Sequence, residues 1–471
     1  MNRYYRTIEL DKILGKLGTY AENEETKSMI RALTPDPDID NVKREMKKTA
    51  DAFTLAVKNG RAPSYPFKDI RPYLQRAVSG ANLSTRELLD TAAMLRQITA
   101  MYDYRRDAQT GETSLDELFF SLTPQQWLEN KIRNAILDED EIADTASPEL
   151  ADIRRRIARA GLRIRESLDK MLRSADVQKT LMENIVTVRD GRFVIPVKAE
   201  YKGQVRGIVH AASASGSTLF IEPEAVVEAN NDIRVLEGME KAEIERILAE
   251  LSSDVASAAD GIGRDYMTCA ELLLYFAKAE LGASMNASVP AIADDGMLIL
   301  KRARHPLLDP KTAVPVDISI GESCNALVVT GPNTGGKTVL LKTAGLLTAM
   351  TMCGLMIPAS DGSKVSVFDN ILVDIGDMQS IEESLSTFSS HMSNIVYILV
   401  KADRHSLVLL DDLGGGTDPV EGAALSIAVI EKLLSQGSRV FVTTHYQELK
   451  VFALERNDVE NASCEFDAKT L

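Results

Sequence analysis

The spacing of hydrophobic residues divides the chain into a helical first part and a last part that alternates strands and helices. From residue 1 to about 137, apolar residues recur at intervals of three and four, which is the spacing of a buried helix face. One such set is Ile8, Leu10, Ile13, Leu14 and Leu17. We therefore predict an all-α core over residues 1–137.

An acidic, broken stretch at 138–150 is predicted to be a linker, and the pattern changes after it. Residues 151–183 contain no proline, and nine basic residues face five acidic ones along an apolar stripe. This pattern predicts one long helix, with Gly161 in its middle.

The hydrophobic period then switches from helix-like to strand-like. Four short β-like runs separated by turn residues lie within 184–222, and we predict a small β-rich tip there. Helical patterning resumes at Pro223, continues to about Ala259 and is now acidic. We interpret 151–265 as two lever helices that pair antiparallel and carry the tip, and 266–296 as a helical return to the core.

From about Met297 the chain alternates strands and helices, which predicts an α/β domain over 297–471. Continuous apolar runs at 326–330, 406–412 and 439–444 are typical of buried parallel strands. The fold class is thus multidomain, with an all-α core and lever arm, a β-rich tip and an α/β domain.

Composition narrows the classes of partner. The net charge of −15 argues against a uniformly basic nucleic-acid binder but leaves local basic patches open. The longest charge-free stretch, 343–360, contains glycines and Pro358, so we interpret it as a buried helix and not as a membrane span. Four widely spaced cysteines lack metal-ligand spacing and fit reduced thiols of a cytoplasmic protein: Cys269, Cys324, Cys353 and Cys464.

One glycine-rich segment between a strand and a helix carries the main chemical signal. It reads Gly331, Pro332, Asn333, Thr334, Gly335, Gly336, Lys337, Thr338. This pattern, between an apolar run and the helix that begins at Val339, is that of a phosphate-binding loop. Backbone N–H groups of the loop would face the phosphates of ATP, Lys337 would reach the β- and γ-phosphates, and the Thr338 hydroxyl would bind Mg²⁺.

Two carboxylates end the apolar run at 406–412 and complete the predicted site. We expect Asp411 to hold Mg²⁺ and Asp412 to orient or deprotonate the attacking water. His445 ends the next strand, at the sheet edge where ligands of α/β sheets bind, and is a candidate for contact with the γ-phosphate. A lone histidine is more often structural, so its assignment depends on the neighbouring motifs.

Ser386 and Thr387 lie before a helical pattern that extends to Lys401. Hydroxyl and N–H groups at a helix start bind a phosphate or simply cap the helix, and the residues alone favour neither interpretation.

Together these motifs resemble the MutS superfamily of ATP-binding-cassette ATPases. The phosphate loop, Ser386-Thr387-Phe388, the 410–417 segment and Thr444-His445-Tyr446 match its nucleotide motifs. The segments 377–382, 413–419, 303–308 and 191–223 resemble the MutS-two branch, which is associated with recombination suppression and rescue of collided ribosomes. The resemblance implies a homodimer in which Ser386 and Thr387 of each subunit complete the ATP site of the other.

Two departures from the family pattern affect the expected activity. The family has glutamate where this chain has Asp412, so we expect ATP binding with slow hydrolysis. Family members continue into a linker and a small MutS-related nuclease domain, so we expect no nuclease activity from residues 1–471.

The leading hypothesis is an ATP-gated dimeric clamp on branched or recombining DNA, or on collided ribosomes. Five basic residues of the tip are the candidate nucleic-acid contacts: Arg189, Arg192, Lys198, Lys202 and Arg206. Charge count alone would favour a solvated surface for them. Phe220-Ile221-Glu222 is interpreted as a buried aromatic residue beside a turn, and mismatch reading is disfavoured.

The sequence disfavours two other functions. A transporter-type cassette that drives a membrane or other protein partner is disfavoured by the predicted arm and by the lack of a Leu-Ser-Gly-Gly-Gln signature. A GTPase is disfavoured because the sequence has no Asn-Lys-x-Asp guanine motif.

Overall fold

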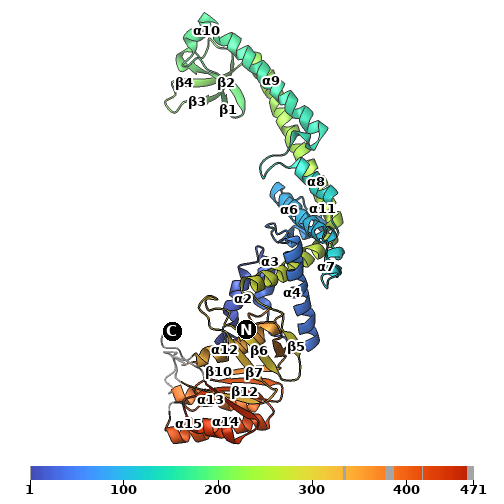
Figure 1. Ribbon diagram of the computed structural model, residues 1–471. Helices are drawn as coiled ribbons and strands as arrows, with labels where there is room; N and C mark the ends of the chain where they lie inside the picture. The colour runs from blue at the N-terminus through green and yellow to red at the C-terminus, as the bar shows by residue number, and fades with distance from the viewer. Residues whose placement is uncertain (1, 332–335, 377–386, 416, 464–471) are drawn as a thin grey trace. The chain divides into compact units, whose positions relative to one another are not determined.

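The computed structural model describes residues 2–331, 336–376, 387–415 and 417–463. The chain forms two compact units (Figure 1). The first comprises Met1–Pro66, Ala100–Thr123 and Asp265–Leu471, and the second comprises Phe67–Thr99 and Pro124–Arg264. Helices α6 (Thr85–Arg106) and α11 (Glu224–Ser284) contribute residues to both units.

Short helices open the first unit, as the apolar spacing predicts. The residues buried by α2 follow a helical period, and Asp38 caps α4 by accepting from the N–H groups of Asp40 and Asn41. These helices are α1 (Arg3–Thr7), α2 (Leu10–Gly18), α3 (Glu24–Ala32), α4 (Ile39–Asn59) and α7 (Asp116–Ser121).

A five-stranded parallel sheet forms the centre of the first unit, in the order β10-β11-β12-β8-β13. Its strands are β8 (Ala326–Thr330), β10 (Asn370–Asp374), β11 (Ser406–Leu410), β12 (Arg439–Thr444) and β13 (Val459–Ser463). Figure 1 shows α12 on one side of this sheet and α14 and α15 on the other. The helices are α12 (Lys337–Met352), α13 (Thr387–Lys401), α14 (Pro419–Ser435) and α15 (Gln447–Glu455).

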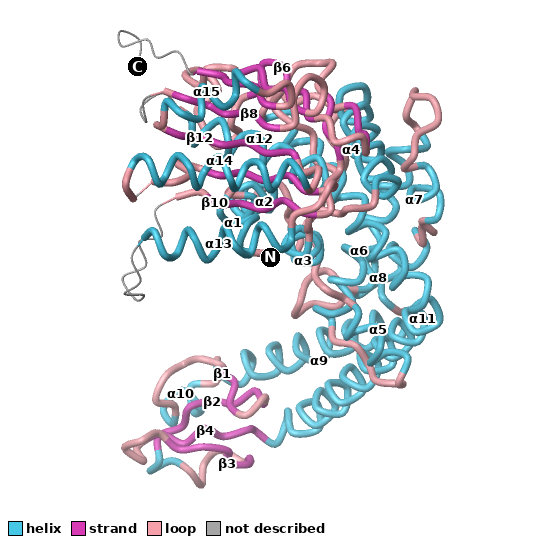
Figure 2. Tube along the Cα trace, turned by 90° about the horizontal axis from the view of Figure 1, so that it is seen from below, coloured by secondary structure: helices cyan, strands magenta, loops and turns pink. Residues whose placement is uncertain are grey.

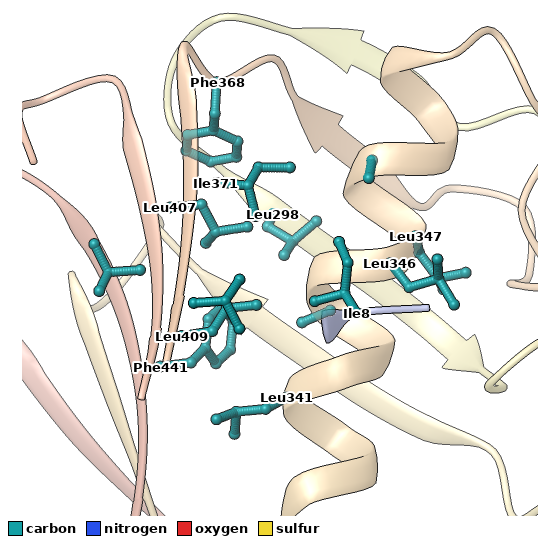
Figure 3. Packing of buried hydrophobic residues seen from close by; sticks show 14 of the residues in the cluster. Ile8, Leu298, Leu341, Leu346, Leu347, Phe368, Ile371, Leu407, Leu409 and Phe441 are labelled. Atoms are coloured by element: carbon teal, nitrogen blue, oxygen red, sulfur yellow. The ribbon is translucent and has the colours of Figure 1, made fainter. Parts of the chain in front are cut away.

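The core of this unit lies between the sheet and α12. Figure 3 shows Leu409 of β11 and Phe441 of β12 near Leu341 of α12, and all three are fully buried. Gly345 of α12 lies at the closest approach, because a Cβ atom there would be 2.4 Å from Leu409 Cδ1. This close packing fixes the position of α12, and with it the position of Lys337 at the start of the helix.

A second, four-stranded sheet has the order β5-β9-β6-β7. Its strands are β5 (Ala291–Ala293), β6 (Leu298–Ala303), β7 (Val316–Ile320) and β9 (Lys364–Ser366). Contrary to the prediction, residues 266–296 are not entirely helical. Helix α11 ends at Ser284, and the strand β5 follows and pairs with β9.

The second unit is mostly helical. Besides α6 and α11 it contains α5 (Arg71–Val78), α8 (Gln126–Ala135), the 3₁₀ turn η1 (Asp144–Ala146), α9 (Pro148–Leu172) and α10 (Ala175–Thr180). The single helix predicted over 151–183 is wrong, because α9 ends at Leu172 and α10 follows after Arg173 and Ser174. The returning helical patterns, in contrast, form one helix of 61 residues, α11.

Helices α9 and α11 run alongside each other in opposite directions, as predicted (Figures 1 and 2). Ser147 Oγ donates to Glu243 Oε1 at 2.6 Å, and Arg154 Nε donates to Glu240 Oε1 at 2.7 Å. The residue numbers of these contacts rise from Ser147 to Arg154 but fall from Glu243 to Glu240, as expected for two antiparallel segments. Arg154 also donates to the carbonyl oxygen of Ile142, which ties the 138–150 stretch to α9.

The predicted β-rich tip is an antiparallel sheet in the order β1-β2-β4-β3. Its strands are β1 (Thr187–Arg189), β2 (Arg192–Lys198), β3 (Gly207–Ala212) and β4 (Thr218–Pro223), with a 3₁₀ turn η2 (Ala199–Tyr201). Phe220 is not the buried aromatic residue that was expected: it is half-buried, and the Arg189 guanidinium lies 4.4 Å from its ring centre.

Candidate nucleotide site

The predicted phosphate loop lies between β8 and α12. Gly331 has φ of 136°, and Gly336, the residue before α12, has φ of 76°. Both values lie in the region that favours glycine, so the loop's two described ends require the residues that the sequence has there. Pro332, Asn333, Thr334 and Gly335 lie outside the described residues, and Val339 is exposed on the first turn of α12.

Lys337 is buried at the start of α12, and only 2% of its surface is exposed. Its Nζ donates to the carbonyl oxygen of Gly331 at 2.7 Å and to that of Thr444 at 3.3 Å. The ammonium group is therefore held at the carboxyl ends of the adjacent strands β8 and β12. A positive charge fixed there is suited to the phosphates of a nucleotide.

Thr338 and Asp411 meet as the sequence predicts. Thr338 Oγ1 donates to Asp411 Oδ2 at 2.7 Å. Hard cations such as Mg²⁺ prefer oxygen ligands, and this pair presents a hydroxyl and a carboxylate at one point. The donor set fits Mg²⁺, and these two residues are the ones that would hold it.

Thr443 connects the Asp411 carboxylate to the backbone of Asp412, and the sequence alone did not indicate it. Its buried hydroxyl donates to Asp411 Oδ1 and accepts from the Asp412 N–H at 2.8 Å. The carbonyl oxygen of Thr443 also accepts from the Leu413 N–H at 3.1 Å. The only signal in the sequence is a hydroxyl residue near the end of an apolar strand.

Asp412 and His445 also lie together. His445 Nε2 is 3.4 Å from Asp412 Oδ1, and 41% and 51% of the two side chains, respectively, is exposed. Asp412 has φ of 48°, a left-handed conformation that aspartate adopts more readily than most residues. A carboxylate and an imidazole that share one exposed edge can both reach a water molecule or a phosphate there.

The glycine-rich turn after Asp412 is packed against Tyr446. Tyr446 Oη donates to the carbonyl oxygen of Gly414 at 2.6 Å. Burial, followed by the charges of Asp412 and Asp418, raises the pKa of Tyr446, so the hydroxyl stays protonated and remains a donor. This contact connects the turn after the carboxylates to the turn that carries His445.

The predicted signature segment, Ser386-Thr387-Phe388, lies only partly within the described residues. Ser386 lies outside the described residues, and Thr387 is the first residue of α13. Its predicted role stays a prediction.

The five basic residues of the tip do not share one environment. Arg192 lies 2.8 Å from Glu222 Oε1, and the Glu222 carboxylate is fully buried and also contacts Asn230 and His210. Arg192 therefore stabilises the packing of β2 against β4 within the tip. Lys198 is half-buried and donates to the carbonyl oxygen of Lys179, whereas Arg189, Lys202 and Arg206 are exposed.

The fold and these contacts define a class. A parallel sheet with a strand–glycine loop–helix unit, a buried loop lysine and a carboxylate strand beside it is a P-loop nucleotide-binding domain.

Comparison with known proteins makes the assignment narrower. Residues 327–470 match the family described as MutS domain V. The chain is 48% identical over 99% of its length to Endonuclease MutS2 of Ruminiclostridium cellulolyticum and to that of Acetivibrio thermocellus, and 47% identical over its full length to that of Brevibacillus brevis. These matches confirm the resemblance of the chain to the MutS superfamily and to its MutS-two branch.

The chain spans 59% to 60% of the length of these relatives. In the described part of the chain, no helix combines the length and the hydrophobicity that crossing a membrane requires. The three described cysteines, Cys269, Cys324 and Cys353, are buried and free, and Cys464 lies outside the described residues.

Proposed function

We propose that this chain is a MutS-type ATPase that acts as a homodimer, in which ATP controls a clamp on a polyanionic ligand. The observation that carries the proposal is the convergence of Lys337, Thr338 and Asp411 at the carboxyl edge of the parallel sheet. Lys337 would bind the phosphates of ATP, and Thr338 and Asp411 would hold Mg²⁺, which neutralises phosphate charge when bound.

Asp412 and His445 are the proposed catalytic residues. Asp412 would orient the attacking water or accept its proton, and His445 would contact the terminal phosphate. Since Asp412 is one methylene shorter than the family's glutamate, we propose that hydrolysis is slow. The 3.4 Å separation of the two side chains supports their joint action.

A homodimer is proposed because the family completes each ATP site with the partner's signature segment, here Ser386 and Thr387. Helix α13, which follows this segment, supports the proposal: Val396, Tyr397 and Val400 are 60%, 46% and 79% exposed. Exposed apolar side chains on one helix are typical of a surface that another protein covers.

The proposed ligand is branched or recombining DNA, or a collided ribosome pair. Both are polyanions, and Arg189, Lys202 and Arg206 offer exposed positive charge on the tip. Contacts of this kind are mainly to phosphates and weaken as salt rises.

A binding panel tests this function. The chain would be titrated with Mg²⁺ and either ATP or ADP, at near-physiological salt, against four ligands: collided ribosome pairs, single ribosomes, four-way DNA junctions and linear duplex. We expect ATP-dependent preference for the collided pairs over single ribosomes, or for the junction over the duplex. Equal binding to all four ligands that ignores the nucleotide would contradict the clamp.

A further inference from the structure

Helix α13 is attached to the edge of the parallel sheet through one buried carboxylate, that of Asp374. This residue ends β10, and only 5% of its surface is exposed. Asn394 Nδ2 donates to Asp374 Oδ1 at 2.8 Å, and His391 Nδ1 lies 2.8 Å from Asp374 Oδ2. Because a carboxylate only accepts, the His391 Nδ1 must carry the proton and donate it.

Through its backbone, the same residue contacts the part of the nucleotide site that contains the proposed Mg²⁺ ligands Thr338 and Asp411, here called the Mg²⁺ side. The Asp411 N–H donates to the Asp374 carbonyl oxygen at 2.8 Å. Asp411 in turn accepts from Thr338, so the hydroxyl at the start of α12 and His391 on α13 are joined by three consecutive hydrogen bonds. Asp374 therefore contacts α13 through its side chain and Asp411 through its backbone carbonyl.

Further contacts fix α13 at this point. Asn394 Nδ2 also donates to the carbonyl oxygen of Val373 at 3.0 Å, and Asn394 Oδ1 accepts from Tyr4 Oη at 3.0 Å and from Arg3. Buried hydrogen bonds are costly to break, so a shift of β10 at Asp374 would move the part of α13 that carries His391 and Asn394 with it.

We propose that Asp374, with His391 and Asn394, is a positioning residue that couples the Mg²⁺ side of one subunit's ATP site to the signature segment of the same subunit. This inference rests on the proposed function, in which that segment completes the partner's ATP site. The carboxylate of Asp374 then acts on hydrolysis in the partner's site, whereas its backbone carbonyl serves the subunit's own site.

The test uses mixed dimers that are purified through two different affinity tags and contain one intact phosphate loop. In the first, an Asp374→Asn subunit is paired with a Lys337→Ala subunit. In the second, a Lys337→Ala/Asp374→Asn subunit is paired with an unchanged subunit. The asparagine keeps the backbone carbonyl, so we expect hydrolysis within about twofold of an unchanged/Lys337→Ala dimer in the first case and a loss of roughly tenfold or more in the second.

Equal loss in both dimers, loss in the first dimer alone, or no loss in either would overturn the inference, because a structural defect would act at least as strongly on the site of the subunit that carries it. His391→Ala, placed in the same two dimers, should give the same asymmetry and covers the case in which Asp374→Asn fails to fold. Asp369→Asn is the matched control, since Asp369 is an exposed carboxylate on the turn before β10. It should leave both dimers unaffected.

Ser386→Ala in the same dimers separates this inference from the proposed function. If Ser386→Ala acts only on the partner's site but Asp374→Asn does not, the inference alone is wrong. If Ser386→Ala shows no such asymmetry, the shared-site dimer is wrong, and the inference falls with it.

Discussion

At the scale of single residues, the hydroxyl group of Thr443 binds the Asp411 carboxylate and the backbone of Asp412. That group donates to Asp411 and accepts from the Asp412 N–H. Thr443→Val keeps the side-chain shape but removes both hydrogen bonds. Because contacts that orient metal ligands are worth about 10- to 100-fold in affinity or activity, we expect the Mg²⁺ dependence of ATP hydrolysis to shift to higher concentration by that factor.

Thr348→Val provides the control for this substitution. Thr348 is also a fully buried threonine of the same unit, but its hydroxyl donates to the Ala344 carbonyl of its own helix. An equal shift in both variants would mean that Thr443 acts only through general stability.

Asp412 gives a second prediction at this scale. Asp412→Glu introduces the longer side chain that the proposed function expects at this position, and we expect it to raise kcat for ATP hydrolysis by about tenfold, since displacement of a catalytic group by roughly 1 Å can cost about 10²-fold. Single-turnover hydrolysis measures the effect directly. An unchanged rate would show that the shorter carboxylate already holds the water well.

Sequence patterns predicted the residues of the site that belong to contiguous motifs. Asp411 follows β11, and Lys337 and Thr338 come after the loop that follows β8, so parallel pairing of these strands through β12 and a short loop bring them to one edge. Thr443 and Asp374 could not be predicted, because their roles depend on the register between β10, β11 and β12. The same limit applies to Arg192, whose partner Glu222 lies on another strand.

At the scale of elements, the packing of α12 on β11 determines where the phosphate loop ends. Gly345→Ala would place a methyl group 2.4 Å from Leu409 Cδ1, and Ile8 Cγ2 lies 3.2 Å away on another side. We expect a loss of about 1–3 kcal/mol in the free energy of unfolding, as overpacked cores show. Urea denaturation measures it.

Gly15→Ala is the contrasting variant. Gly15 is exposed in α2, and no atom lies within 4 Å of its added Cβ. Alanine should stabilise that helix by roughly 0.5–1 kcal/mol. If Gly345→Ala behaved like Gly15→Ala, α12 would not be closely packed on the sheet.

The type of an element was predictable wherever a periodic hydrophobic pattern extended over many residues. The residues at which elements begin and end were not predictable. The break after Leu172 involves neither glycine nor proline, and Ser174 before α10 is its only local signal. The opposite error occurred near Ala259, where the sequence predicts the end of the returning helix, whereas α11 continues through Gly261 and Gly263 to Ser284. Each glycine costs a helix only about 1 kcal/mol, which packing along a 61-residue helix readily offsets.

At the scale of the whole molecule, the proposed clamp requires charge on the tip that is free to meet a ligand. Lys202→Glu with Arg206→Glu should weaken binding to the preferred ligand. If that ligand is duplex or junction DNA, the slope of log K against log salt should fall by about 2, since each phosphate contact contributes about 0.9. Lys241→Glu, an exposed lysine of α11, is the control. Unchanged affinity and slope in the double variant would remove the tip from the proposed ligand surface.

The proposed function depends most directly on the binding and hydrolysis of ATP with Mg²⁺ at the edge of the parallel sheet. The decisive measurement is ATP hydrolysis across an Mg²⁺ titration for the unchanged chain, Lys337→Ala, Asp411→Asn and Lys432→Ala. Lys432 is an exposed lysine in the last turn of α14 and serves as the control. We predict slow, Mg²⁺-dependent hydrolysis that Lys432→Ala retains and that both other variants lose by at least about 10²-fold. Hydrolysis that persists in Lys337→Ala and Asp411→Asn would contradict the assignment of this site.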